Sequence, residues 1–74
     1  MLADKMNGYP VIAEANLPDV EGMHKNRSII MVDRGGGRYC VATRIAEYDT
    51  WNQGDYLNSL GEAQARFIER WKRG

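Results

Sequence analysis

The 74-residue sequence predicts an α+β domain: a three- to four-stranded antiparallel sheet with one C-terminal helix packed on one face. Segments rich in β-branched and aromatic residues come first and are separated by glycine, proline and asparagine, which is typical of strands and turns. A run of three glycines lies between two of these segments and favours a hairpin. Only the last segment repeats apolar residues at helical spacing. The expected element order is therefore β-β-β-(β)-α.

The N-terminal part is expected to hold one strand and one long loop. Residues 1–8 lack periodicity and are predicted to be a flexible N-terminus, so that residues 9–74 form a single small domain. The first strand is expected over residues 9–15. Pro10 cannot donate to a sheet ladder, which places it at the start of the strand or on a sheet edge. Residues 16–26 are rich in turn formers, and the length of this loop makes it a candidate for mobility or binding.

The second and third strands are expected over residues 27–33 and 38–46, as the arms of a glycine-tipped hairpin. A turn centred on Gly35 and Gly36 suits a primed hairpin, because both central residues need positive φ. This turn predicts a register that pairs Val32 with Tyr39, Met31 with Cys40, Ile30 with Val41, Ile29 with Ala42 and Ser28 with Thr43.

Both faces of this hairpin are apolar near its middle. The helix is expected on the side of Cys40 and Ala42, because small side chains let a helix approach closely. The opposite face then needs a cover, which is either a partner molecule or the first strand and long loop of the chain itself. That face is expected to carry Ile30, Val32, Tyr39 and Val41.

The C-terminal part is expected to hold a short fourth strand and the helix. Residues 54–57 suit a short strand, and Ser59 with Glu62 fits a capping box. The helix is predicted over residues 60–72. Its apolar stripe is expected to contain Leu60, Ala63 or Gln64, Phe67, Ile68 and Trp71.

Composition narrows the functional classes. Ten basic and ten acidic residues give a formal net charge of zero, which disfavours nucleic acid as a partner. One cysteine and one histidine exclude an internal disulfide and a Cys/His metal site, and we expect no cofactor. Self-association then remains as a way to stabilise so small a domain, which makes a homodimer an expectation. The longest apolar run, residues 29–32, is far too short for a membrane span, and a cytoplasmic location is expected.

The residue inventory argues against catalysis. Cys40 lies in the middle of a predicted strand and is expected to be a small buried residue, while His24 lies in the long loop with no carboxylate beside it. Glu47, Asp49 and Asp55 lie close together, but a chain of this size can hardly enclose a substrate cleft between them. We therefore expect no catalytic residue and no metal site.

Two sets of residues are candidates for binding. Trp51 and Tyr48 lie in a polar loop over residues 47–53, and an exposed tryptophan often anchors an interface. With Arg34 and Arg38 they form the predicted contact set for a protein partner, either a host protein or a second copy. The alternative function is a small nucleic-acid-binding module using Arg27, Arg34, Arg38 and Arg44.

Residues 39–71 resemble small uncharacterised proteins of actinobacterial phages and prophages. The shared features are a strand ending in a V-A-T-R-like motif, a tryptophan-bearing loop, a G-x-Y-[FL] segment and an E-A-x-x-x-F-x-x-R helix. The resemblance brings no established activity and assigns no site residues. It implies a viral accessory protein that acts inside a bacterial host, and the leading expectation is a non-enzymatic protein-interaction module.

Overall fold

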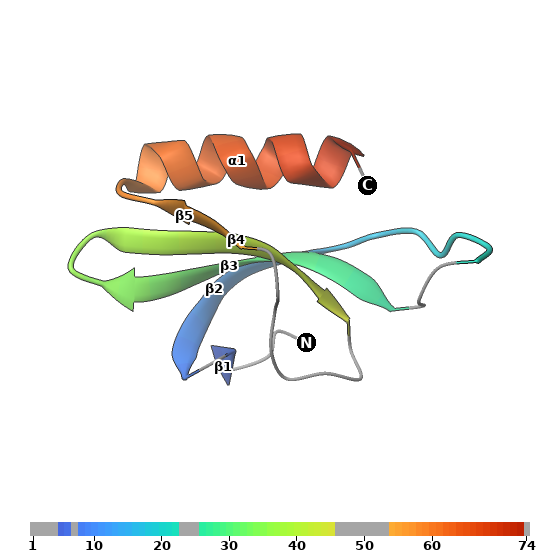
Figure 1. Cartoon of the computed structure of the whole chain (residues 1–74), viewed down its shortest axis with the longest axis horizontal. Coiled ribbons are helices and arrows are strands. Elements are labelled where there is room, and N and C mark those ends of the chain that lie inside the picture. The colour runs from blue at the N-terminus through green and yellow to red at the C-terminus, as the bar shows by residue number, and fades with distance from the viewer. Residues whose placement is uncertain (1–4, 7, 23–25, 46–53, 74) are drawn as a thin grey trace.

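The computed structural model describes residues 5–6, 8–22, 26–45 and 54–73 (Figure 1). Five strands pair antiparallel in chain order, and one helix packs on a face of the sheet, which confirms the predicted α+β fold. The elements are β1 (Lys5–Met6), β2 (Tyr9–Asn16), β3 (Arg27–Gly35), β4 (Arg38–Ile45), β5 (Asp55–Leu57) and α1 (Leu60–Arg73).

The β3–β4 hairpin turns one residue later than the sequence suggested. Gly36 and Gly37 have φ of 64° and 77° and connect the paired residues Gly35 and Arg38. Arg34 is an extra residue on β3, because the register shifts between Asp33 and Gly35. The expected register is therefore wrong by one residue. The observed pairs include Val32 with Cys40, Met31 with Val41, Ile30 with Ala42 and Ile29 with Thr43.

The shifted register also changes the side on which the helix packs. We call the apolar core under α1 the helix-side cluster: Leu17, Ile29, Met31, Val41 and Ala63, with Ala13, Tyr39, Leu57 and Phe67 packed against it. The helix thus lies on the Val41 side of the sheet, and the expectation that it packs on Cys40 and Ala42 is wrong. The small residue that permits close approach is on the helix, since Ala63 is fully buried.

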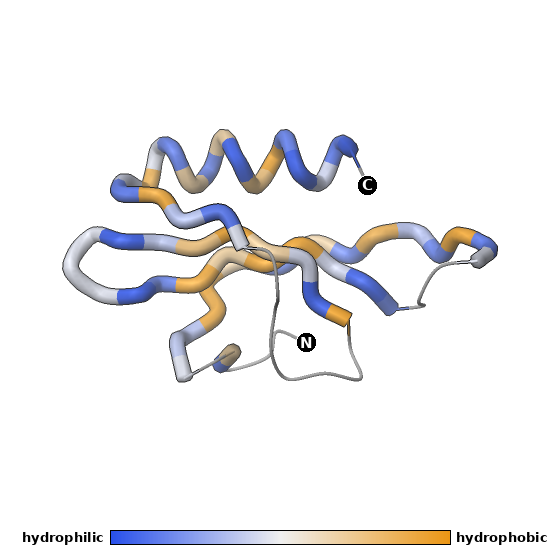
Figure 2. The backbone as a smooth tube through the Cα atoms, viewed as in Figure 1, coloured by the Kyte–Doolittle hydropathy of each residue, from blue (hydrophilic) through white to orange (hydrophobic). Residues whose placement is uncertain are grey.

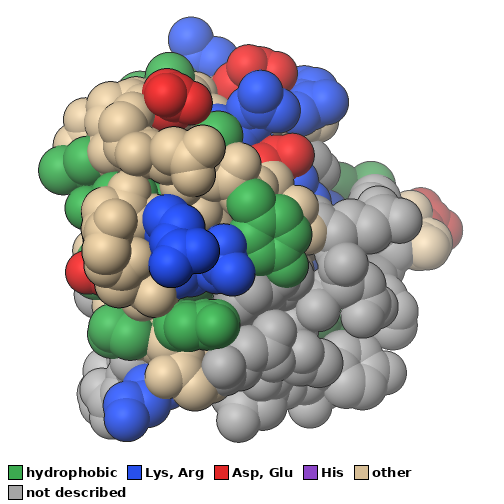
Figure 3. Space-filling model, turned by 60° about the vertical axis from the view of Figure 1, so that its left-hand side comes forward, with side chains coloured by type: hydrophobic (Ala, Val, Ile, Leu, Met, Phe, Trp, Pro, Cys, Tyr) green, Lys and Arg blue, Asp and Glu red, His purple; other side chains and the backbone are tan. Residues whose placement is uncertain are grey.

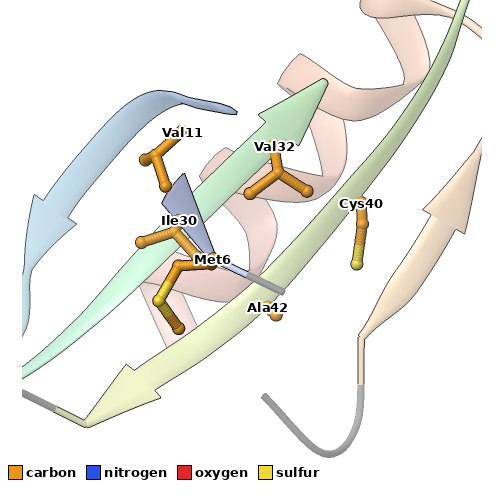
Figure 4. Close-up of a cluster of buried hydrophobic side chains, with 6 residues drawn as sticks. All are labelled: Met6, Val11, Ile30, Val32, Cys40 and Ala42. Carbon is orange, nitrogen blue, oxygen red and sulfur yellow. The ribbon is translucent and has the colours of Figure 1, made fainter. Parts of the chain in front are cut away.

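The opposite face carries a second core, the rear cluster, formed by Met6, Val11, Ile30, Val32, Cys40 and Ala42. Figure 4 shows the side chain of Met6 from β1 beside Ile30 of β3, with Cys40 and Ala42 on β4. Met6 and Ile30 are both 0% exposed. The sequence left two possible covers for this face, a partner molecule or the N-terminal part of the chain. Met6 of β1 and Val11 of β2 belong to the rear cluster, so the N-terminal part of the chain helps to cover it.

The strand β1 was not assigned from the sequence, where residues 1–8 were expected to be flexible. Met6 pairs with Tyr9, and Gly8 has a φ of 84°. Asn-Gly between two short extended segments is a strong hairpin signal, and it is present here as Asn7-Gly8. Residues 1–4 and residue 7 lie outside the described part of the chain.

Polar contacts fix α1 at both ends. At its start, Ser59 Oγ accepts a hydrogen bond from the Glu62 backbone N–H at 3.2 Å, as the predicted cap requires. In the last turns, Arg70 makes two contacts with the sheet. Its Nη1 donates to Asp55 Oδ2 at 2.9 Å, and its Nε donates to Thr43 Oγ1 at 3.2 Å. These bonds tie the helix to β5 and β4 and so set its direction across the sheet.

Candidate interaction surfaces

Two of the arginines predicted for nucleic-acid binding have structural roles. Arg27 is 7% exposed, and its Nη2 donates to the Pro18 carbonyl at 3.3 Å. Arg44 Nη1 lies 3.0 Å from Glu14 Oε2, which also accepts a hydrogen bond from Ser28 Oγ at 2.5 Å. Glu14 and Arg44 thus join β2 to β4 across β3. These contacts use one nitrogen of each guanidinium group to hold neighbouring segments together.

The other two arginines, Arg34 and Arg38, lie at the opposite end of the same hairpin. Figure 2 shows hydrophilic residues on both strands next to the turn. Arg38 is exposed and Arg34 is half-buried. Because Arg27 pairs with Ile45 while Arg38 pairs with Gly35, the strand length separates the two arginine groups. The structure therefore places Arg34 and Arg38 at one end of the hairpin and Arg27 and Arg44 at the other, so that the four arginines do not form one patch.

Arg34 lies between two tyrosine rings from other strands. Its guanidinium carbon is 4.7 Å from the ring centroid of Tyr56 on β5 and 5.7 Å from that of Tyr9 on β2. Both distances are in the range of cation–π attraction. Neither tyrosine was singled out as a partner of Arg34, because the contact depends on how β2 and β5 flank the hairpin.

Trp51 and Tyr48, the aromatic residues predicted for a protein partner, lie outside the described residues, as does His24. Their contribution to binding stays a prediction from the sequence.

Cys40 is buried in the rear cluster, with 1% of its surface exposed. Burial raises the pKa of its thiol from an ordinary 9.0 to about 11; the nearby Arg34 lowers it, Asp55 raises it and Arg70 lowers it. The thiol is therefore protonated at neutral pH. A nucleophilic cysteine needs the thiolate and access to a substrate, and Cys40 has neither in this position.

One hollow in the described part of the surface is an apolar groove of about 390 Å³ between β2 and α1. It is lined by Ile12, Ala13, Met31, Leu60, Gln64, Phe67 and Ile68. Gln64 is the polar member of this set. Three of the apolar members are large and substantially exposed: Ile12 at 44%, Leu60 at 44% and Ile68 at 53%.

The groove arises because α1 lies mainly over β3, β4 and β5 and covers β2 incompletely; near the end of the helix, Trp71 Nε1 donates to the Asn16 carbonyl of β2 at 3.3 Å. A β-bulge adds to it: the β2–β3 register shifts between Val11 and Ala13, so that Ile12 is the extra residue. Val11 then points into the rear cluster, while Ile12 and Ala13 both line the groove on the helix side. A strand with strict alternation would place Ile12 and Ala13 on opposite faces. The sequence therefore did not predict that Ile12 lies exposed beside the helix.

Within the described residues, no group of three His, Cys, Asp or Glu side chains is arranged to hold a metal ion, and no helix has the length and apolarity to cross a membrane. Comparisons of the chain with protein-family models, with curated proteins and with solved structures gave no match.

Proposed function

We propose that this chain is a non-enzymatic protein-interaction module that binds a protein partner through the groove between β2 and α1. The observation that supports this is the exposure of Ile12, Leu60 and Ile68 around one apolar hollow. Contiguous apolar surface on a small domain is typical of a site that another protein covers. The sequence-based contact set of Trp51, Tyr48, Arg34 and Arg38 stays a second, separate proposal.

Of the two partners considered from the sequence, a second copy suits the groove better than a host protein. A two-fold interface brings the same surface patch of both copies together, so that a patch carrying charge of one sign would repel itself. None of the described residues that line the groove is charged, and the whole chain has a formal net charge of zero. Both features favour self-association.

The contact is proposed in the groove rather than along the edge of β2. Among the described residues, β1 pairs with β2 only at Tyr9 and Pro10, so the outer edge from Val11 to Asn16 has no strand partner there. The bulge at Ile12 interrupts that edge, and bulges hinder edge-to-edge pairing. Helix and strand side chains packed across the groove are the better route to a dimer.

The test is the solution mass of the chain by sedimentation or light scattering at high micromolar concentration. Wild type is expected near twice the chain mass of 8.4 kDa. Ile68→Asp is expected to be monomeric and folded, because Ile68 is 53% exposed. Val20→Asp is the matched control, since Val20 is 47% exposed in the β2–β3 loop and outside the groove. A monomeric wild type would contradict the dimer and leave a host protein as the partner.

The cellular setting is also a proposal, and it depends on the resemblance of residues 39–71 to actinobacterial phage proteins. In that setting the chain would be a viral accessory protein in the host cytoplasm. Its mechanism would be steric occupancy of a partner surface, with burial of apolar side chains supplying the affinity.

A further inference from the structure

The hairpin end has a second surface that the groove does not involve. We call it the Tyr–Arg patch and define it by Tyr9, Arg34, Arg38 and Tyr56. Figure 3 shows Lys and Arg side chains lying between hydrophobic side chains at this end of the molecule. Strands β2, β3, β4 and β5 each contribute one member, so the sheet holds the patch in place.

The patch carries positive charge that no described carboxylate neutralises. Arg44, Arg66, Arg70 and Arg73 each form a salt bridge with Asp or Glu. Among the described residues, Arg34 and Arg38 form none, and Arg34 Nε is buried without a hydrogen-bond partner. The hairpin end therefore carries two positive charges without a counter-ion among the described residues.

The nearest acid in sequence, Asp33, belongs to the other face. Asp33 pairs with Tyr39, and side chains of directly paired residues lie on the same face of a sheet. Because Tyr39 packs against the helix-side cluster, Asp33 lies on the helix side. Its Oδ1 also accepts a hydrogen bond from the Gly35 N–H at 2.8 Å. Asp33 is therefore placed to brace the turn rather than to neutralise Arg34.

Tyr56 adds an exposed aromatic side chain to this charge. Arg34 lies over the ring at 4.7 Å, and Tyr56 is 59% exposed, so that a second planar group can reach part of the side chain. Aromatic rings beside arginines form the usual platform for the bases and phosphates of single strands. An acidic peptide would use the arginines but would give the exposed tyrosine no role.

We propose that the Tyr–Arg patch binds single-stranded nucleic acid, with a base stacked on Tyr56 and the adjacent phosphates held by Arg34 and Arg38. The ligand chemistry is an unpaired base next to a phosphate. A duplex does not offer this, because its bases are stacked on one another and out of reach of a surface tyrosine. The site differs from the four-arginine module expected from the sequence, since Arg27 and Arg44 take no part.

The test is fluorescence anisotropy of labelled oligo(dT) and oligo(rU) of about ten nucleotides at low ionic strength, with a thymidine mononucleotide, a duplex and an oligoglutamate peptide as competitors. Both single strands are expected to bind. In a plot of the logarithm of the binding constant against the logarithm of the salt concentration, two phosphate contacts predict a slope of about −1.4, because each contact on a single strand contributes about −0.7. The duplex and the peptide are expected to compete at least tenfold less well than an unlabelled single strand. Competition by the mononucleotide at similar concentration would instead make a free nucleotide the ligand and overturn the strand proposal.

Variants separate stacking from charge. Tyr56→Ala is expected to weaken binding about tenfold or more with the salt slope unchanged, because it removes stacking alone. Arg38→Ala is expected to reduce the slope to about −0.7. Lys72→Ala is the matched control, because it removes an exposed positive charge far along α1 and should change nothing. Circular dichroism checks the fold of each variant.

Three further results would overturn the proposal: no binding at low ionic strength, equal affinity of Tyr56→Ala and wild type, or tighter binding of the acidic peptide than of single strands. The outcome is independent of the groove. Ile68→Asp is expected to bind oligonucleotides as wild type does, so that failure of one proposal leaves the other standing.

Discussion

The two faces of the sheet are closed by very different elements. A 14-residue helix packs on one face, and the two-residue strand β1 with the start of β2 folds over the other. The larger cover leaves Leu60 and Ile68 about half exposed beside a groove. The smaller cover belongs to a cluster in which Met6 is 0% exposed and Cys40 is 1% exposed.

The helix-side face shows that a long amphipathic element need not seal the core beneath it. The helix is amphipathic, yet Ala63 is the residue of α1 that becomes fully buried. A cylinder on a twisted sheet cannot cover all strands equally, so α1 lies mainly over β3 to β5 and covers β2 incompletely. The face with the incomplete cover is the one where we expect a partner.

The largest expected effect on stability comes from a substitution in the rear cluster. Met6→Ala removes a fully buried side chain and is expected to lower the free energy of unfolding by about 3 kcal/mol. In so small a domain this is a large share of the total stability. Urea unfolding followed by circular dichroism measures it. Lys5→Ala, at the exposed neighbour, should cost little; equal stabilities of the two variants would mean that β1 does not seal the rear cluster.

A somewhat smaller effect is expected under the helix. Ala63→Leu adds volume where α1 lies against the sheet and is expected to cost about 2 kcal/mol through overpacking. Ala65→Leu makes the same change at an exposed position of the same helix and should be nearly neutral. Thermal unfolding of both variants tests the contrast. A neutral Ala63→Leu would show that the helix can lift from the sheet at little cost.

The smallest effect concerns the pH dependence of the rear cluster. The pKa of Cys40 is raised to about 11 by burial, so the unfolded chain loses the thiol proton at lower pH than the folded chain. The folded state then binds more protons, and stability falls as pH rises above about 9. The loss is about 1 kcal/mol between about pH 9 and pH 10. Cys40→Ala should lack this component, and identical pH profiles for wild type and variant would place the thiol in contact with water.

Much of the fold could be predicted from local sequence signals. The glycine run between apolar segments, the Ser59 cap and the apolar repeat of residues 60–72 each indicate one element by short-range chemistry. The structure places β2 to β5 and the helix within one or two residues of those expectations, whereas β1 was not expected. The burial of Cys40 also follows from its place in the middle of a strand.

The sites were harder to predict, because two bulges decide them. The extra residue Arg34 shifts the β3–β4 register and moves the helix to the Val41 face. The extra residue Ile12 turns an apolar side chain into the groove. A bulge reverses the in–out alternation beyond it, and no single residue type marks its position.

The sequence by itself determined which segments become strands, turn and helix, since caps, glycines and apolar spacing act over a few residues. The tertiary structure decided which side chains meet: Tyr56 with Arg34, Glu14 with Arg44, and Ile12 with the flank of α1. These contacts join residues from separate strands and the helix, so they depend on register and on how the sheet twists under the helix. Both proposed binding surfaces are made of such contacts.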